Sequence, residues 1–229
     1  MNIAVIPARG GSQRIPRKNI KLFHGLPIIA YAIKAALASD DIHEVFVSTD
    51  DEEIAEIAIS FGAKVPWLRS KELSDDYATT ISVMKDAVLR LNFSLTSLEN
   101  ICCIYPTTPL LKPSFLSDAL KILEKGNWNY VFSGAMANTA PQRFFSLGAK
   151  MEVEPLYPEY ELARTQDLEK FYGDAGQFYW GRKSAWESGL PIFSSFSTIF
   201  EIPRDLAVDI DTLEDWHYAE ILFKAMNGK

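Results

Sequence analysis

The sequence predicts an α/β protein built on a doubly wound, mostly parallel sheet. Short, continuous apolar runs recur from residue 3 to residue 133, and stretches with apolar residues at helical spacing separate them. Continuous apolar runs suit strands that are covered on both faces. Their alternation with helices favours parallel pairing through right-handed crossovers. With 229 residues and 48% hydrophobic content, the chain suits one domain over 1–229 with a sizeable core.

The first apolar run, 3–6, ends at Pro7 and leads into a basic loop that matches neither GxxxxGK(S/T) nor GxGxxG. The loop has two adjacent glycines, no acid and five cations, which are Arg9, Arg14, Arg17, Lys18 and Lys21. Glycines let backbone N–H groups approach an anion, and cations add charge and donors. Residues 1–40 hold six Lys or Arg and one acid, a net charge of +5 in a chain of −7. We therefore interpret the loop as a polyphosphate cradle; the alternative is a solvated basic loop.

Apolar spacing and the positions of proline and glycine predict the elements that follow. They are a helix from Pro27 to about Ser39, strands over 43–49 and 64–68, a helix from Asp50 to Gly62, a helix starting at Thr79 or Thr80, a buried strand over 101–104, a helix over 114–125 and a strand over 130–133. The acidic run 50–53 suits either a metal site or a capping box, and we favour Asp50 as N-cap with Glu53 three residues later. The turn 48–50 also ends a strand, where ligands bind in such sheets.

Residues 136–176 interrupt this alternation. The stretch contains three prolines and many aromatic residues without a clear period. A structureless loop of this length is implausible in a compact domain. We therefore expect an excursion that packs on a second copy of the chain, which predicts a homodimer. The chain then returns to the sheet with a strand over 174–180.

The last motif is Asp209-Ile210-Asp211. In extended backbone, positions i and i+2 share a face, so the two carboxylates converge with Ile210 buried behind them. Close like charges are costly unless a cation lies between them, which predicts a Mg²⁺ site. The alternative makes Asp211 the N-cap of a final helix over 212–225 and leaves Asp209 merely exposed.

Composition argues against several other classes of protein. A net charge of −7 argues against nucleic-acid binding, and no apolar run has the length of a membrane span or a signal peptide. Cys102 and Cys103 are adjacent within an apolar run, which favours strand packing in a reducing cytosol over a disulfide. The three histidines have no ligand spacing, so zinc is not expected. We expect a cytoplasmic protein.

Two linked segments carry a family resemblance. IPARGGS over 6–12 and IPRKN over 15–19 resemble the opening motif of the cytidylyltransferases that activate sialic-acid-like sugars. The resemblance extends over nearly the whole chain, through the segment 69–80, the turn YPTTPL over 105–110 and the acidic pair. It implies a Rossmann-like sheet of the nucleotide-diphospho-sugar transferase type and a homodimer that shares substrate pockets. The family has lysine where this chain has Gln13, and we expect Arg14 to take over that phosphate contact.

Carried onto this chain, the resemblance implies a set of site residues. The nucleotide would contact Ala8, Arg9, Gly10, Gly11, Ser12, Arg14, Lys18, Asn19, Arg69 and Thr80, the last two at the cytosine base. The sugar would contact Tyr105, Thr107, Arg143, Arg164, Asp174, Gln177 and Tyr179. The catalytic set would be Arg9, Lys18, Asp209 and Asp211, with the two aspartates as Mg²⁺ ligands. For the arginines at 69, 143 and 164, the alternative is a surface residue without a ligand.

The activity implied is transfer of CMP from CTP to the anomeric hydroxyl of a nonulosonic acid, with release of pyrophosphate. Tyr105 replaces a glutamine of the sialic-acid enzymes, and residues 174–177 replace a Pro-Asn-Gly-Ala pattern; both differences favour pseudaminic acid. N-acetylneuraminic and legionaminic acid are the alternative sugars. A non-catalytic nucleotide-sugar-binding module and a glycosyltransferase with an Asp-x-Asp metal site are the alternative functions.

Overall fold

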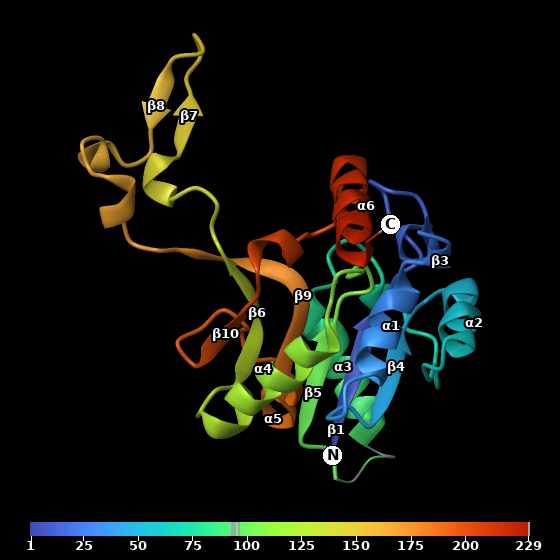
Figure 1. Cartoon of the computed structure of the whole chain (residues 1–229). Coiled ribbons are helices and arrows are strands. Elements are labelled where there is room, and N and C mark those ends of the chain that lie inside the picture. Colours follow the sequence, from blue (N-terminus) through green and yellow to red (C-terminus); the bar gives the residue numbers. More distant parts are fainter. Residues whose placement is uncertain (93–94, 96, 229) are drawn as a thin grey trace.

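The computed structural model describes residues 1–92, 95 and 97–228 and confirms the α/β class (Figure 1). A six-stranded sheet lies at its centre, in the order β10-β6-β9-β5-β1-β4. In that order the strands are Ser197–Glu201, Tyr130–Met136, Tyr172–Arg182, Asn100–Ile104, Asn2–Pro7 and Glu44–Ser48. Strand β9 runs antiparallel to β5 and β6, and the other pairs are parallel. The sheet is therefore largely parallel, as the sequence predicts.

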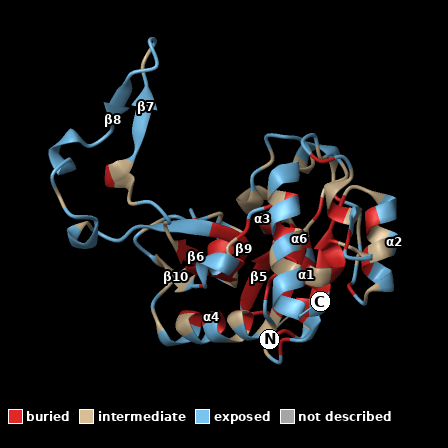
Figure 2. Ribbon diagram, turned by 45° about the horizontal axis from the view of Figure 1, so that its top comes forward, coloured by how far each residue is buried: buried red, intermediate tan, exposed pale blue. Residues whose placement is uncertain are grey.

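Helices cover both faces of the sheet. The helices are α1 (Ile29–Leu37), α2 (Glu52–Ser60), α3 (Thr80–Asn92), α4 (Pro113–Lys125), α5 (Lys183–Ser188) and α6 (Leu213–Asn227). One core joins α1, α2 and α4 to Cys102, and the core on the opposite face joins α3 and α5 to Cys103. Adjacent strand residues thus enter opposite cores, which form the buried layers of Figure 2. Both cysteines are free and buried, as strand packing requires. Within the described residues, no helix combines the length and the apolar character needed to cross a membrane.

A third core fixes the basic loop beside the carboxyl end of the sheet. Trp216 and Ala219 of α6 belong to it, together with Ile15 and Ile28 from the chain after β1. The helix α6 starts with a capping box in which Thr212 is the N-cap and Asp215 reaches back to its N–H. The alternative with Asp211 as N-cap is therefore wrong, and the Asp211 carboxylate is free for other contacts.

Strands β6 and β9 lead into an arm, residues 137–171, that projects from the body of the molecule (Figure 1). The arm carries a small hairpin of β7 (Phe145–Leu147) and β8 (Val153–Pro155). Most of it is exposed (Figure 2), and Leu162 is 97% exposed. An excursion is thus present within the predicted range 136–176, whereas its packing on a second copy stays a prediction.

Three details of the predicted elements are wrong. Pro27 closes a hairpin of β2 (Leu22–Phe23) and β3 (Leu26–Pro27), so the helix begins only at Ile29. Residues 64–68 make two isolated bridges instead of a strand, because Pro66 cannot donate to a ladder. The N-cap of α2 is Asp51, which accepts the Ile54 N–H at 2.9 Å, and not Asp50.

Candidate functional site

A cavity of about 640 Å³ opens at the carboxyl end of the sheet. Its walls come from the basic loop after β1, the segment 69–80, the turn after β5 and the segment 209–211. The predicted site residues that line it are Arg9, Ser12, Arg14, Lys18, Asn19, Arg69, Thr80, Tyr105, Thr107, Asp209 and Asp211. These distant segments meet because the carboxyl ends of parallel strands share one edge of a sheet. The cavity has the size of a small-molecule site.

Two cations of the basic loop meet one carboxylate of the opposite wall. The Lys18 ammonium donates to the Ile210 carbonyl at 2.6 Å and lies 3.3 Å from the Asp211 carboxylate. The Arg14 guanidinium lies 2.8 Å from the same carboxylate. Opposite charges therefore hold the N-terminal loop against the C-terminal acidic segment.

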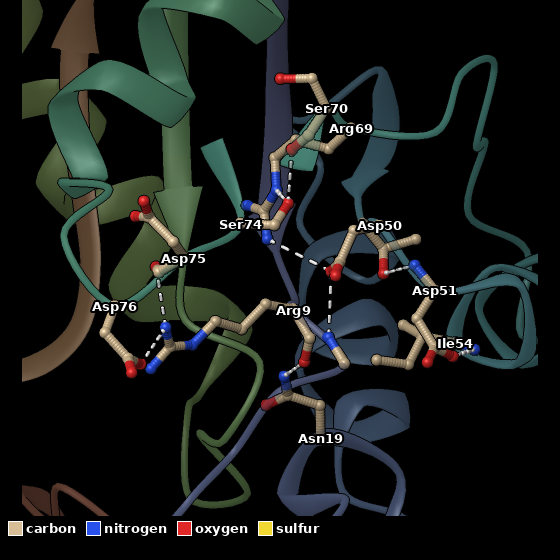
Figure 3. Close-up of polar contacts among 12 residues, drawn as sticks. Arg9, Asn19, Asp50, Asp51, Ile54, Arg69, Ser70, Ser74, Asp75 and Asp76 are labelled. Carbon is tan, nitrogen blue, oxygen red and sulfur yellow. Dashed lines mark hydrogen bonds and ion pairs between the residues drawn. The ribbon is translucent and has the colours of Figure 1, made fainter. Parts of the chain in front are cut away.

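Arg9 pairs with a second acidic segment, which precedes α3. Its Nη1 lies 2.7 Å from the Asp76 carboxylate and donates to the Asp75 carbonyl at 2.9 Å (Figure 3). The Gln13 amide also donates to Asp76, at 2.5 Å. Gln13, where the family resemblance implies a lysine, is thus bound to an acid of this chain.

The glycine turn is held from behind by hydrogen bonds. The Gly10 N–H donates to the Asp50 carboxylate at 3.0 Å, and the Asn19 side chain donates to the Arg9 carbonyl at 2.9 Å (Figure 3). The Gly10 amide is therefore occupied by a carboxylate of the protein. Among the nucleotide contacts predicted in this loop, Ala8, Gly10 and Gly11 do not line the cavity.

Asp209 and Asp211 line the cavity from an irregular segment, not a strand, and Ile210 between them is fully buried. Burial and the nearby Asp211 raise the pKa of Asp209. Gly176 leaves room for this carboxylate, since a Cβ there would lie 3.1 Å from the Asp209 carboxyl carbon. Within the described residues, no group of three or more His, Cys, Asp or Glu could hold a metal ion. Two carboxylates still fit Mg²⁺, which uses one or two and completes its shell with water and phosphate.

The turn after β5 presents Tyr105 to the cavity, and Thr80 at the start of α3 holds the Tyr105 hydroxyl. The Thr80 and Tyr105 hydroxyl oxygens are 2.8 Å apart. The Tyr105 and Tyr179 rings are 5.2 Å apart, and the Tyr179 hydroxyl donates to Asp174 at 2.6 Å. Burial raises the pKa of Tyr105 to about 12, so its hydroxyl is neutral at physiological pH. Tyr179 and Asp174 do not line the cavity themselves but support Tyr105 from behind.

Besides Asp174 and Tyr179, three other predicted sugar contacts do not line the cavity. Gln177 is buried, and its amide donates to the Leu206 carbonyl. Arg143 donates to backbone carbonyls within the arm, including that of residue 160 at 3.1 Å. Arg164 is exposed on the arm. A single chain therefore does not bring the arginines of the arm to its own cavity.

The sequence reasoning missed the acids that face the cations, Asp75 and Asp76, which both line the cavity. Asp75 accepts the N–H groups of Tyr77 and Ala78 at 2.9 and 2.8 Å. Aspartate commonly fixes a turn in this way, so its presence just before a predicted helix was an available signal. The position of Asp76 opposite Arg9 had no such local signal.

Comparisons with known proteins agree with this architecture. A family model described as cytidylyltransferase matches residues 3–179. The chain is 42% identical to the pseudaminic acid cytidylyltransferase of Campylobacter jejuni over 97% of this chain and 96% of that protein. It is 36% identical to N-acylneuraminate cytidylyltransferase A of Danio rerio over 95% of this chain and 49% of that protein.

Solved structures share the fold at lower identity. CMP:2-keto-3-deoxy-manno-octonic acid synthetase complexed with CTP superposes with a TM-score of 0.70 at 18% identity, over 98% of this chain and 99% of that one. A cytidylyltransferase from Leptospira borgpetersenii superposes with a TM-score of 0.61 at 17% identity, over 99% of this chain and 94% of that one. At such identities the likeness concerns the fold alone.

Proposed function

The chain belongs to the cytidylyltransferase family, and from this premise we propose that it transfers CMP from CTP to the anomeric hydroxyl of a nonulosonic acid, releasing pyrophosphate. The observation that carries the proposal is the cavity in which the basic loop faces the acidic segment 209–211. Cations on one wall suit a triphosphate, and carboxylates on the other suit the divalent ion that accompanies it.

The proposed sugar is pseudaminic acid, for which the 42%-identical relative is named. The Tyr105 hydroxyl is engaged by Thr80, so the ring offers chiefly a flat apolar face to the cavity. Such a face suits the methyl group of a deoxy sugar better than a hydroxylated glycerol tail. N-acetylneuraminic acid, which suits the 36%-identical relative, is the second candidate.

In this proposal Arg9, Arg14 and Lys18 bind the triphosphate, and Arg69 and Thr80 orient the cytosine. The three cations now contact acids or carbonyls of the chain, and these contacts exchange for phosphate oxygens when CTP binds. Phosphoryl transfer needs alignment and charge neutralisation more than covalent help from the protein. The cations on the loop supply both.

Asp209 and Asp211 are the proposed Mg²⁺ ligands. When bound there, the ion neutralises phosphate charge and lowers the pKa of the sugar hydroxyl. The anomeric oxygen bonds to the α-phosphorus as its proton passes to solvent water, and the bond from that phosphorus to the β-phosphate oxygen breaks. Arg9 and Lys18 neutralise the charge on the departing pyrophosphate.

We propose further that the arm packs on a second copy, so that the functional unit is a homodimer. Its exposed apolar residues include Phe145, Leu147, Val153, Leu156 and Leu162. Large apolar side chains exposed together on one arm are typical of a surface that packs against a partner. Arg164 would then reach the cavity of the partner chain, while Arg143 keeps the arm in shape through its carbonyl contacts.

Incubation with CTP, Mg²⁺ and a panel of nonulosonic acids, followed by a pyrophosphate assay, tests the proposal. A cytidylyltransferase releases pyrophosphate only when CTP and a suitable acid are both present. A nucleotide-sugar-binding module binds CTP without turnover, and a glycosyltransferase consumes a finished nucleotide sugar instead. Either of these last two outcomes contradicts the proposed function.

A further inference from the structure

Asp50 joins two walls of the cavity without lining it (Figure 3). It follows β4, the edge strand beside β1, and so lies next to the glycine turn. Its Oδ1 accepts the Gly10 N–H at 3.0 Å and lies 3.8 Å from Nη2 of Arg69. One carboxylate oxygen thus contacts the phosphate-side loop and the arginine assigned to the base.

Arg69 is buried, so its orientation depends on the groups around it. Its side chain is 3% exposed, its Nε donates to the Ser74 hydroxyl at 3.1 Å, and its backbone N–H donates to the Thr49 carbonyl at 2.7 Å. Burial lowers the pKa of Arg69, and the Asp50 carboxylate opposes that shift. Within the part of the chain that the structure describes, Asp50 is the single ion-pair partner of this guanidinium and Nη1 makes no hydrogen bond. The Ser74 hydroxyl therefore fixes Nε by a hydrogen bond, the Asp50 charge attracts Nη2 from 3.8 Å without a hydrogen bond, and Nη1 is left for a ligand.

Helix capping does not account for Asp50. The N-cap of α2 is the next residue, Asp51, which accepts the Ile54 N–H at 2.9 Å. Asp50 instead turns toward Gly10 and Arg69, and its side chain is only 27% exposed. A carboxylate in this position is either a structural counter-charge or a device that sets the direction of Arg69.

We propose that Asp50 is a positioning residue that directs Arg69 at the cytosine ring, so that selection of CTP over UTP depends on the Asp50 charge. The inference rests on the proposed function, in which CTP is a substrate. Cytosine presents an acceptor at N3, whereas uracil presents an N–H donor there. A fixed guanidinium N–H donates to N3 of cytosine but faces another donor in uracil and is left unpaired. An unpaired buried donor costs binding free energy, so the site discriminates strongly against uracil. A guanidinium free to turn loses that preference.

Asp50→Asn separates the two contacts, because an amide oxygen can still accept the Gly10 N–H while the charge opposite Arg69 is lost. Isothermal titration calorimetry with CTP and with UTP gives both Kd values without turnover. We expect the wild-type protein to favour CTP, and Asp50→Asn to reduce the ratio of the two Kd values by at least ~10-fold. Asp50→Glu, which keeps the charge, should restore part of the ratio. Should Asp50→Asn fail to fold, Asp50→Ser is measured in the same way.

Two further variants make the result specific. Arg69→Ala should lose the same selectivity, and the Asp50→Asn, Arg69→Ala double variant should lose no more, because the two residues act as one unit. Glu52→Gln is the matched control, since it removes an exposed carboxylate two residues away and should keep the wild-type ratio.

Unchanged selectivity in Asp50→Asn, even with weaker binding of both nucleotides, would reduce Asp50 to a structural role and overturn the inference. A wild-type protein that binds CTP and UTP equally would also overturn it, while the pyrophosphate assay would still decide the transfer reaction. If the wild-type protein binds neither CTP nor UTP, this result would contradict both the proposed function and this inference.

Discussion

Asp76→Asn should tighten the binding of CTP, because Asp76 and the triphosphate compete for Arg9. The Asp76 carboxylate lies 2.7 Å from Nη1 of Arg9 and accepts a hydrogen bond from Gln13 at 2.5 Å. These contacts must open before Arg9 reaches a phosphate. The carboxylate also lines the cavity and repels a polyanion there. Asparagine keeps the shape and an acceptor for Gln13 but removes the negative charge.

The expected gain follows from the exposure of the pair. The Arg9 and Asp76 side chains are 37% and 51% exposed. Ion pairs in such surroundings contribute ~0.2–1 kcal/mol, which corresponds to a Kd for CTP lower by ~1.4- to 5-fold. The gain should shrink as ionic strength rises, because salt screens exposed charges.

Calorimetry with CTP at low and high salt measures this difference. CMP should bind equally to the wild-type protein and Asp76→Asn, because Arg9 is assigned to the β- and γ-phosphates. Glu72→Gln is the matched control, since Glu72 lies on the same segment and its contacts are with its own backbone and near neighbours. Weaker CTP binding by Asp76→Asn would refute the competition and show that Asp76 organises Arg9 or holds the metal.

Three other predictions concern the metal, the fold and the assembly. Asp209→Asn and Asp211→Asn should each lower kcat by at least ~10²-fold with the fold intact, because a metal carboxylate is lost; a fully active variant with unchanged Mg²⁺ dependence would remove the metal assignment. Asp51→Ala should lower the free energy of unfolding by ~1–2 kcal/mol at neutral pH, because an N-cap and a partly exposed ion pair are lost. The Arg17 guanidinium lies 2.5 Å from the Asp51 carboxylate and lowers the pKa of that carboxyl. The stabilising contribution is therefore complete above the ordinary aspartate pKa and disappears as pH falls through the lower folded-state pKa. Denaturant unfolding in which the difference between the wild-type protein and Asp51→Ala stays constant into strong acid would contradict this prediction. Light scattering should give twice the 25.8 kDa chain mass, and a monomer at micromolar concentration would count against the role of the arm.

Five of the six strands of the central sheet could be predicted because each has a local apolar pattern, whereas β10 was not predicted. The run 101–104 is continuously apolar, and all of it is buried between two helical layers. The meeting of the basic loop with Asp209 and Asp211 could also be predicted, since the carboxyl edge of such a sheet collects the functional loops. The irregular backbone at 209–211 did not matter, because Ile210 is buried and both carboxylates still line the cavity.

The details that failed depend on partners distant in sequence. Asp50 and Asp51 are almost equally good N-cap candidates in sequence, and the choice between them is made by tertiary contacts. Arg17 pairs with Asp51, while Gly10 and Arg69 contact Asp50. No local pattern reports such partners. The same holds for the arm, whose residues lack a period because they pack on little of their own chain.

The fate of the α-phosphorus of CTP tests the central claim most directly. With pseudaminic acid and Mg²⁺, label placed on the α-phosphorus should appear in the sugar conjugate, and label on the γ-phosphorus should appear in pyrophosphate. The kcat/KM for pseudaminic acid should exceed that for N-acetylneuraminic acid by at least ~10²-fold. Comparable values for the two acids would contradict the choice of sugar. An α-label that never enters a sugar conjugate, whichever acid is supplied, would contradict the reaction itself.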